Sequence, residues 1–337
     1  MPFPAPFPLP PGEHPPMTLG FFIQNIINAL QWGSFYALIA LGYSMVYSIL
    51  MLFNFAHGDI FMVGAYIGLG VAIVLLKVVG TGAAALMPGW AVLVVTILIS
   101  MFLTAFVGII VERVGYRPLR HAPRASAAIT GLMIGIILET SNVLFLGGQR
   151  LHFPQLVQSQ TYDIGGIFIT NKKIMIVPLS VGLMIALHQF VARSRWGMAM
   201  RAMAYDFVVV PLVGVPINTI AAMTFAIGSA LAAAAGILFG LAYPVLDPYM
   251  GVSLGWKAFV AAILGGRGSI MGACIAGFML GFIEIMTVPA IQIMNRLFEL
   301  NIGSNLRDLI AYSIVLVILV FRPHGLFGEA YSARLRL

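Results

Sequence analysis

The sequence contains very little charge. Only 9% of its 337 residues are Asp, Glu, Lys or Arg, whereas 61% are apolar and the mean hydropathy is +1.01. Because a soluble domain carries about 25% charged residues, this chain cannot cover a water-facing surface, and a soluble globular fold is excluded. The net charge of +7 fits contacts of cytoplasmic loops with membrane lipid better than it fits nucleic acid binding.

Cysteine and the common catalytic motifs are also scarce. The single cysteine, Cys274, excludes an internal disulfide and a Cys-based metal cluster. No phosphate-binding Gly-x-x-x-x-Gly-Lys-Ser/Thr loop and no His-Glu-x-x-His zinc motif occurs. His57 has no second ligand at metal-binding spacing. We therefore expect no enzyme activity, no cofactor and no metal on this chain, and an intramembrane enzyme is the least favoured alternative.

Charged residues are absent from four long stretches, namely 14–58, 78–111, 174–191 and 207–246. A helix crosses the hydrocarbon with about 20 apolar residues, and helices satisfy every backbone polar group in lipid. The sequence thus predicts an all-α polytopic transmembrane helix bundle. About eight spans are expected, near 20–48, 60–79, 90–112, 126–147, 174–192, 217–242, 257–282 and 305–321.

The basic residues predict the orientation of the chain. Arginines are concentrated in the segments 113–124 and 193–206, which the positive-inside rule places in the cytoplasm. The C-terminal tail, 329–337, is also basic, yet three spans between 206 and 322 would place it outside. A broken or re-entrant element near 263–272 would restore the count, because its glycines are unsuited to a plain span. The proline-rich residues 1–17 predict an extended tail rather than a signal peptide.

The two halves of the chain share a weak pattern. In the first half Gly33-Ser34 opens a small-residue helix, and the segment 54–59 leads to Gly64-Ala65. In the second half Gly228-Ser229 opens such a helix, and 265–269 leads to Gly272-Ala273. Transporters built from repeats show this kind of symmetry, with interrupted helices along the solute path. Chance similarity among 36 glycines is the alternative.

Polar residues inside the predicted spans are the candidates for a translocation pathway, since ionisable groups in lipid are costly. Asn54 and His57 are three residues apart and would share one face of a helical turn, and Asp59 stands where an N-cap would. A break near 50–60, the first of two along the chain, is expected for this reason. The structural alternative is that the three residues only position two helices.

Further pathway candidates are Glu139, which lies inside the predicted span 126–147, and the glycines of the second break, Gly265, Gly266 and Gly268. Glu112 and Glu284 are expected near helix ends. Snorkelling of the side chain, or an arginine partner such as Arg113, would then satisfy the charge.

The segment 193–206 predicts a short amphipathic cytoplasmic helix from residue 197. Met198, Arg201 and Tyr205 share one face of it. Such a helix suits a groove on a partner protein, and the alternative is a surface helix whose arginines meet lipid headgroups.

Several motifs together resemble the LivH-type permease of bacterial branched-chain amino acid ABC importers, over about residues 18–328. They are Gly33-Ser-Phe-Tyr-Ala-Leu-Ile-Ala-Leu-Gly-Tyr-Ser-Met-Val-Tyr47, Asn54-Phe-Ala-His-Gly58, Glu112-Arg-Val-Gly-Tyr-Arg-Pro-Leu-Arg120, Gly197-Met-Ala-Met-Arg-Ala202, and the run from Lys257 to Gly272. The resemblance implies a multi-pass inner-membrane subunit. Its implied partners are a second, LivM-like permease, two cytoplasmic ATPases that use ATP, and a periplasmic solute-binding protein.

The resemblance also implies that the loop of about 193–216 couples the permease to an ATPase, through Gly197, Arg201, Ala202, Asp206 and Gly214. The sequence departs from the family at 209–211, where the helix is expected to end early, and at Glu139, a charge where relatives carry a neutral polar residue. Leucine, isoleucine and valine are the expected solutes. Urea or short amides, and a self-sufficient secondary transporter or channel, are the alternatives.

Overall fold

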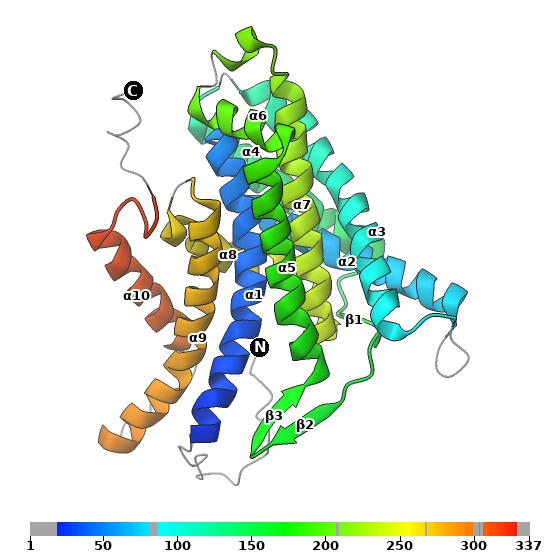
Figure 1. The fold of residues 1–337 in the computed structure, drawn as a ribbon, viewed down its shortest axis with the longest axis vertical. Coiled ribbons are helices and arrows are strands. Elements are labelled where there is room, and N and C mark those ends of the chain that lie inside the picture. Colours follow the sequence, from blue (N-terminus) through cyan, green and yellow to red (C-terminus); the bar gives the residue numbers. More distant parts are fainter. Residues whose placement is uncertain are drawn as a thin grey trace.

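The computed structural model describes residues 19–80, 86–120, 122–206, 209–266, 268–298, 303 and 306–328. The two tails expected at 1–17 and 329–337 lie outside these residues. The described part is a bundle of helices with four short strands, which confirms the all-α prediction (Figure 1).

Seven described helices are long and apolar enough to cross a membrane. They are α1 (Leu19–Leu50), α2 (His57–Val79), α3 (Gly89–Ile110, extended by irregular turns to Leu119), α4 (Arg124–Leu146), α5 (Asn171–Arg193), α7 (Ile217–Ala242) and α9 (Ile270–Phe298). Three shorter helices accompany them: α6 (Arg195–Tyr205), α8 (Met250–Gly265) and α10 (Arg307–Phe321).

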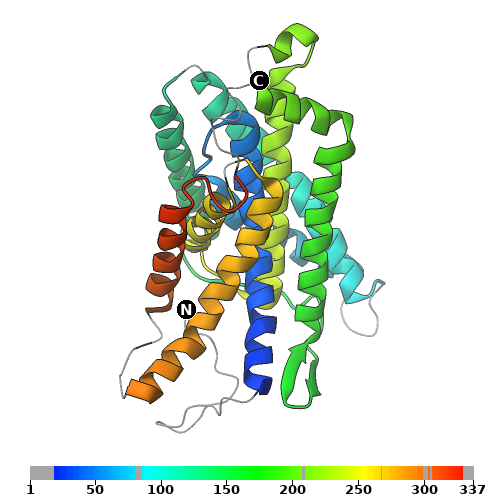
Figure 2. The same ribbon diagram turned by 60° about the vertical axis from the view of Figure 1, so that its left-hand side comes forward.

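Helix α1 is the centre of the bundle. It packs against α9 on one side and against α7 and α5 on the other, as Figure 1 and Figure 2 show. Small residues allow these helices to approach closely: a Cβ atom on Gly281 of α9 would lie 2.4 Å from the backbone nitrogen of Gly33 in α1. Without a hydrophobic force between helices in lipid, such close backbone packing holds the bundle together.

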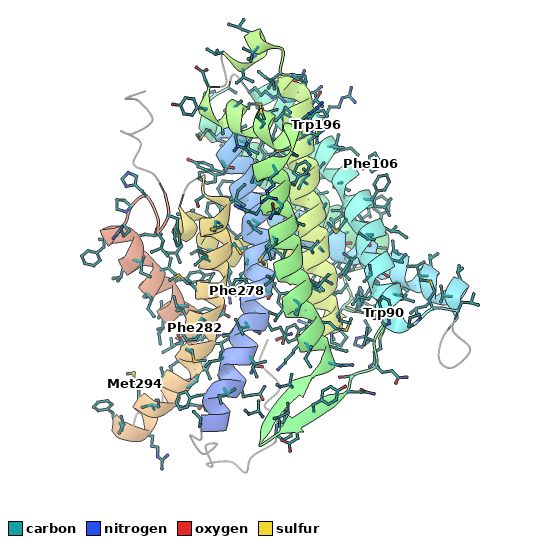
Figure 3. The ribbon with its side chains drawn as sticks, in the orientation of Figure 1. Trp90, Phe106, Trp196, Phe278, Phe282 and Met294 are labelled. Atoms are coloured by element: carbon teal, nitrogen blue, oxygen red, sulfur yellow. The ribbon has the colours of Figure 1, made fainter. Side chains whose placement is uncertain are left out.

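The outer helices present large apolar side chains away from the bundle. Trp90 and Phe106 on α3, and Phe282 and Met294 on α9, are labelled in Figure 3 and are 44–59% exposed. An apolar outer surface is compatible with lipid as the surrounding solvent.

A β-hairpin lies at the end of the bundle opposite α6 (Figure 1). Strands β2 (Thr161–Ile164) and β3 (Ile167–Thr170) form an antiparallel hairpin in which Thr161 pairs with Thr170. The turn residues Gly165 and Gly166 both have positive φ, as a tight two-residue hairpin turn requires. Strands β1 (Leu151–His152) and β4 (Val245–Leu246) pair antiparallel in a separate two-stranded sheet.

The two arginine-rich segments lie at one end of the bundle, as the sequence predicts. Arg120, which follows α3, donates a hydrogen bond of 2.6 Å to Asn218 Oδ1 at the start of α7. Helix α7 follows the segment 193–216 directly. Glu112 is also held here, but by Arg120 at 2.5 Å and Arg117 at 3.7 Å rather than by Arg113.

The predicted span over 257–282 is wrong, because the chain breaks after Gly265. Helices α8 and α9 are joined by a turn in which Ser269 N donates to Gly266 O at 3.1 Å. The broken element expected near 263–272 is thereby confirmed. The span expected at 305–321 is found as α10, but its 15 residues are fewer than the roughly 20 needed for a full crossing.

The predicted span 257–282 is divided between α8 and α9, so four helices instead of three lie between residues 206 and 322. Leu326 N donates to Leu264 O at 2.8 Å and Phe327 N donates to Gly265 O at 3.1 Å, so segment 322–328 lies on the α8–α9 turn. The same turn and α6 line one cavity of about 410 Å³. With α7, α8, α9 and α10 between them, α6 and the described C-terminal segment lie at the same end of the bundle.

Candidate functional site

The first break, residues 51–56 between α1 and α2, returns the chain into the interior of the bundle. Helix α2 begins at His57, whose imidazole occupies the space beside Gly42 of α1. A Cβ atom added to Gly42 would lie 2.1 Å from His57 Nε2. Gly42 is eight residues before the end of α1 at Leu50, which corresponds to about 12 Å of helix. The N-terminus of α2 is therefore inside the membrane-spanning part of the fold.

Two details predicted for this segment are wrong. Asn54 and His57 do not share a helical turn, because Asn54 precedes α2 in a non-helical segment. Asp59 is not the N-cap, a position that Ala56 occupies; it lies in the first turn of α2. All three side chains are buried, with exposed fractions of 2%, 1% and 8%, and their place in a translocation pathway stays a prediction.

Two tyrosines hold the first break in place. Tyr116, at the end of α3, donates from its hydroxyl to Asn54 Oδ1 at 3.1 Å. Tyr43 of α1 accepts a hydrogen bond of 3.2 Å from the backbone N–H of Gly58. Buried backbone and amide groups need such partners where the chain is not helical.

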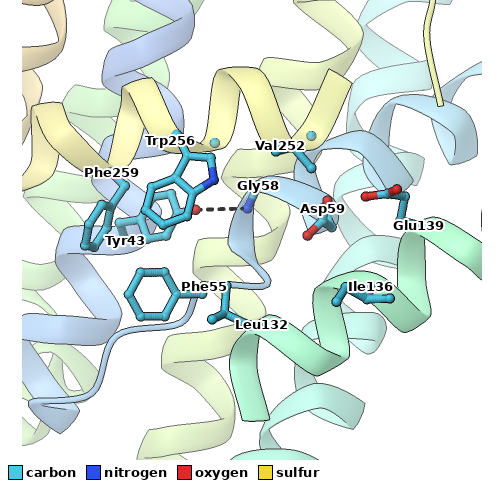
Figure 4. A pocket seen from close by; sticks show the side chains of 12 residues that line it. Tyr43, Phe55, Gly58, Asp59, Leu132, Ile136, Glu139, Val252, Trp256 and Phe259 are labelled. Atoms are coloured by element: carbon cyan, nitrogen blue, oxygen red, sulfur yellow. Dashed lines mark hydrogen bonds between the residues drawn. The ribbon is translucent and has the colours of Figure 1, made fainter. Parts of the chain in front are cut away.

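A cavity of about 130 Å³ lies beside the start of α2, between α1, α4 and α8. We call it the acidic crevice. Asp59 and Glu139 line one side, and the aromatic side chains line the other (Figure 4); these are Tyr43, Phe55, Trp256 and Phe259. The structure thus brings two of the predicted pathway residues together, whereas Asn54 and His57 are buried behind them.

The crevice opens on the outer face of the subunit. Four apolar residues around it, from α4 and α8, are 41–55% exposed: Leu132, Ile136, Val252 and Trp256. Carboxylates beside a lipid-facing surface are strongly disfavoured, and such groups instead face a protein neighbour or water. The α4–α8 face is therefore a candidate boundary of a solute pathway.

The second break directly follows the predicted residue Gly265, which ends α8, and contains the other two, Gly266 and Gly268. Gly266 and Gly268 have φ of +107° and +91°, which favours glycine. A small cavity of about 10 Å³ reaches from Tyr43 and Phe259, which also line the acidic crevice, to Gly268. Of the described crevice-lining residues, none belongs to this turn.

The predicted coupling segment forms helix α6, whose position is fixed by α5. Ser194 caps the helix, accepting from Gly197 N at 2.8 Å. Gly197 is required at this contact, because a Cβ atom would lie 2.3 Å from Val191 O. The Arg201 guanidinium also hydrogen-bonds to Val191 O. Gly197 and Arg201 therefore attach α6 to the end of α5.

The remaining coupling residues shape the turn after α6. Ala202 is half-buried within the helix, and Asp206 follows it and accepts from Val209 N at 3.0 Å. A 3-10 turn at Val210–Val213 ends at Gly214, which has φ of +82°. The early end of the helix expected from residues 209–211 is thus confirmed, with α6 ending at Tyr205.

Large apolar side chains are exposed on this segment. Met198 and Tyr205 of α6 are 63% and 67% exposed, and Leu212 and Val213 at the following turn are 83% and 72% exposed. The turn projects beyond the ends of the long helices (Figure 1). We call these four residues the apolar tip.

A buried ion-pair network was missed by the sequence reasoning, which places Glu284 near a helix end. The residue lies within α9, 2% exposed. It accepts from Tyr36 Oη at 2.7 Å and Lys257 Nζ at 2.8 Å, and pairs with Arg307 at 3.2 Å. Lys257 also pairs with Asp308 at 3.0 Å. The signal was present, since Lys257 and Glu284 are opposite charges inside apolar stretches.

One serine-hydrolase pattern occurs in the chain, at Gly251-Val-Ser-Leu-Gly255. In hydrolases this serine lies on a strand-to-helix turn. Here Ser253 is inside α8 and donates to Met250 O at 3.2 Å, so the structural context of the motif is missing.

Comparison with known proteins relates this architecture to transport. A family model described as the permease component of branched-chain amino acid transport systems matches residues 25–320. The chain belongs to this permease family. The permease is 36% identical over 312 residues to BraD of Pseudomonas aeruginosa, a high-affinity branched-chain amino acid transport system permease protein, covering 91% of this chain and 96% of BraD.

Two further relatives show the range of the similarity. LivH of Escherichia coli, another high-affinity branched-chain amino acid transport system permease protein, is 34% identical over 314 residues, covering 92% of the permease and 96% of LivH. The ribose import permease protein RbsC of Haemophilus influenzae is 22% identical over 314 residues, covering 91% and 87%. Related sequences thus serve an amino acid system and a sugar system.

Proposed function

We propose that this permease is the membrane-spanning subunit of an ABC importer in a bacterial inner membrane and that it translocates branched-chain amino acids. The named functions of BraD and LivH, at 34–36% identity over more than 90% of the chain, support the solute class. ATP is used by separate subunits, because this sequence has no phosphate-binding loop.

The observation that carries this proposal is the apolar tip. Met198, Tyr205, Leu212 and Val213 expose large apolar surfaces at the end of the bundle that carries the arginine-rich segments. Exposed apolar groups outside the membrane favour a protein partner over water or charged headgroups. In the proposed complex a cytoplasmic ATPase covers the tip, and Gly197 and Arg201 transmit its movement to α5.

The pathway in this proposal runs along the α4–α8 face. A second permease subunit covers the acidic crevice, so that Asp59 and Glu139 face a shared path instead of lipid. Closure of two ATPases on ATP rotates the paired permeases and opens the path alternately to each side. A periplasmic binding protein delivers solute at the end that carries the β2–β3 hairpin and selects it.

Reconstitution tests the proposal. We expect the permease, assembled with its co-purifying subunits in liposomes with its binding protein, to accumulate radiolabelled leucine only when ATP is present. The permease alone should show no uptake under a proton or sodium gradient. Gradient-driven uptake by the single chain would instead establish a secondary transporter, and ATP-driven uptake of urea without leucine would overturn the solute class.

A matched pair of variants tests the docking surface. Leu212→Ser in the apolar tip should reduce co-purification of the ATPase at least 10-fold, because it removes exposed apolar contact area. Leu309→Ser on α10, a residue that is 61% exposed away from the tip, should leave it unchanged. Equal ATPase recovery from both variants would remove the coupling assignment.

A further inference from the structure

The acidic crevice differs from the other buried acidic sites in having no basic partner. Glu284 is paired with Lys257 and Arg307, and Glu112 with Arg120. Among the described residues, no Lys, Arg or His nitrogen lies within 4.0 Å of the carboxylate of Asp59 or Glu139. Asp59 and Glu139 line the same side of this cavity (Figure 4).

The Asp59 carboxylate is held between two helices by glycines. A Cβ atom on Gly135 of α4 would lie 2.3 Å from Asp59 Oδ2, and one on Gly251 of α8 would lie 2.7 Å from Oδ1. Asp59 is 8% exposed, and within the described part of the chain Oδ1 has no hydrogen-bond donor. Oδ1 is therefore buried without a donor, and Asp59 lines the wall of the cavity.

The opposite wall is aromatic. The ring centroids of Phe55 and Phe259 are 5.1 Å apart, and both lie 5.8 Å from that of Trp256. Figure 4 shows these rings on one side and the two carboxylates on the other. Carboxylates bind an ammonium group directly, and aromatic faces attract a cation and also accept an aliphatic chain.

We propose that the acidic crevice binds the ammonium group of the solute during its passage, with the aliphatic side chain of the solute against Trp256 and Phe259. This inference rests on the proposed permease function and specifies its ligand chemistry: an aliphatic primary ammonium compound, such as a neutral amino acid. The bound ammonium supplies the positive charge that the two carboxylates lack. Urea and other uncharged solutes gain nothing from this site.

Direct binding to the purified permease tests the inference without its partners. Isopentylamine has the ammonium group and branched chain of leucine, and isopentanol is its uncharged isostere. We expect isopentylamine to quench the fluorescence of Trp256 saturably and isopentanol to bind at least 10-fold more weakly, the factor that loss of a charged hydrogen bond gives. Trp256→Phe should remove the signal and so assign it to the crevice.

Three variants identify the group responsible. Glu139→Gln and Asp59→Asn, which preserve shape, should each weaken isopentylamine binding at least 10-fold and leave isopentanol binding unchanged. Asp163→Asn, in the exposed β2–β3 hairpin, should alter neither. Equal binding of the two probes, or unchanged amine binding in both crevice variants, would overturn the inference and show that the carboxylates are structural.

Transport by the assembled complex separates this inference from the proposed function. Glu139→Gln should raise the KM for ATP-driven leucine uptake at least 10-fold while the ATPase still co-purifies. If Glu139→Gln and Asp59→Asn both transport leucine with wild-type KM, the inference fails although the permease function stands. If the wild-type complex shows no ATP-driven uptake, the proposed function fails, whatever the binding assays give.

Discussion

The two breaks in this bundle look alike in sequence and differ in structure. The first, residues 51–56, returns into the interior and leads to three buried polar residues: Asn54, His57 and Asp59. The second, 266–269, lies at the same end as α6 and is covered by the segment 322–328. A glycine near a polar residue therefore indicates a break, but the contacts around the break decide whether it lies inside the bundle or at its end.

The contacts explain the difference. At the first break, Gly58 packs directly on α8, Tyr43 accepts a hydrogen bond from Gly58 N, and Tyr116 donates one to Asn54 Oδ1. At the second break, glycines with positive φ allow a tight reversal between α8 and α9. The first connects α1 to α2 inside the bundle, and the second connects α8 to α9 at the end that carries α6.

The largest expected effect concerns the helices that the second break joins. Glu284→Ala leaves Lys257 and Arg307 buried without their shared carboxylate, and should destabilise the protein by about 3–5 kcal/mol. Thermal unfolding in detergent measures this change. Asp308→Asn, whose side chain is 44% exposed, should cost less than about 1 kcal/mol. Equal losses would show that Glu284 is not the centre of the network.

The next largest effect concerns the first break. Gly58→Ala would place a Cβ atom 2.5 Å from Gly251 O and 2.8 Å from the Cα of Gly255. Because both obstacles are backbone, α2 and α8 must separate, at a cost of about 3 kcal/mol. The folded yield after size-exclusion chromatography should fall sharply.

The control for this change is Gly70→Ala in the same helix. No other atom lies within 4 Å of a Cβ there, and alanine favours the helix, so the yield should be unchanged or slightly higher. A tolerated Gly58→Ala would contradict the close seating of α8 on the first break.

A third prediction returns to the second break. Gly266→Ala combines a φ of +107° with a Cβ only 2.3 Å from Gly328 N, and should cost about 2 kcal/mol in thermal stability. Gly147→Ala has a φ of +88° but open space around it, so it reports the backbone strain alone. The loss at Gly266 should exceed that at Gly147, and the reverse order would show that the C-terminal segment does not rest on this turn.

The smallest expected effect also concerns the first break. Tyr116→Phe removes the hydrogen bond to Asn54 Oδ1, which should reduce the free energy of unfolding by about 1 kcal/mol. Tyr249→Phe, at an exposed position, should have no measurable effect in the same thermal assay. A null result at both positions would mean that Asn54 is held by other contacts.

The sequence was sufficient for the class of fold and for both breaks. Long uncharged stretches directly indicate membrane-spanning helices. Three spans between 206 and 322 would have placed the basic C-terminal tail outside the cytoplasm, so an extra element was required near 263–272. The sequence could not show that one helix ends at Gly265 and another starts at Ile270, because the residues on both sides of the turn are apolar. The predicted span 257–282 was therefore wrong.

The site was only partly predictable for a related reason. Asp59 and Glu139 were identified one at a time as costly charges, but 80 residues separate them, and no pattern states that α4 lies on α2. Glu284 was undervalued because its partners Lys257, Arg307 and Tyr36 come from three other helices. Tertiary contacts, which local periodicity does not encode, decide both cases.

Helix α5 connects the two ends of the bundle. It starts at Asn171, directly after strand β3, and ends at Arg193, one residue before α6. Its 23 residues, which include Pro178, span roughly 34 Å, and Arg201 of α6 hydrogen-bonds to its Val191 O. In the proposed importer, a movement of α6 by the ATPase would therefore act on the same helix that carries the β2–β3 hairpin at its other end.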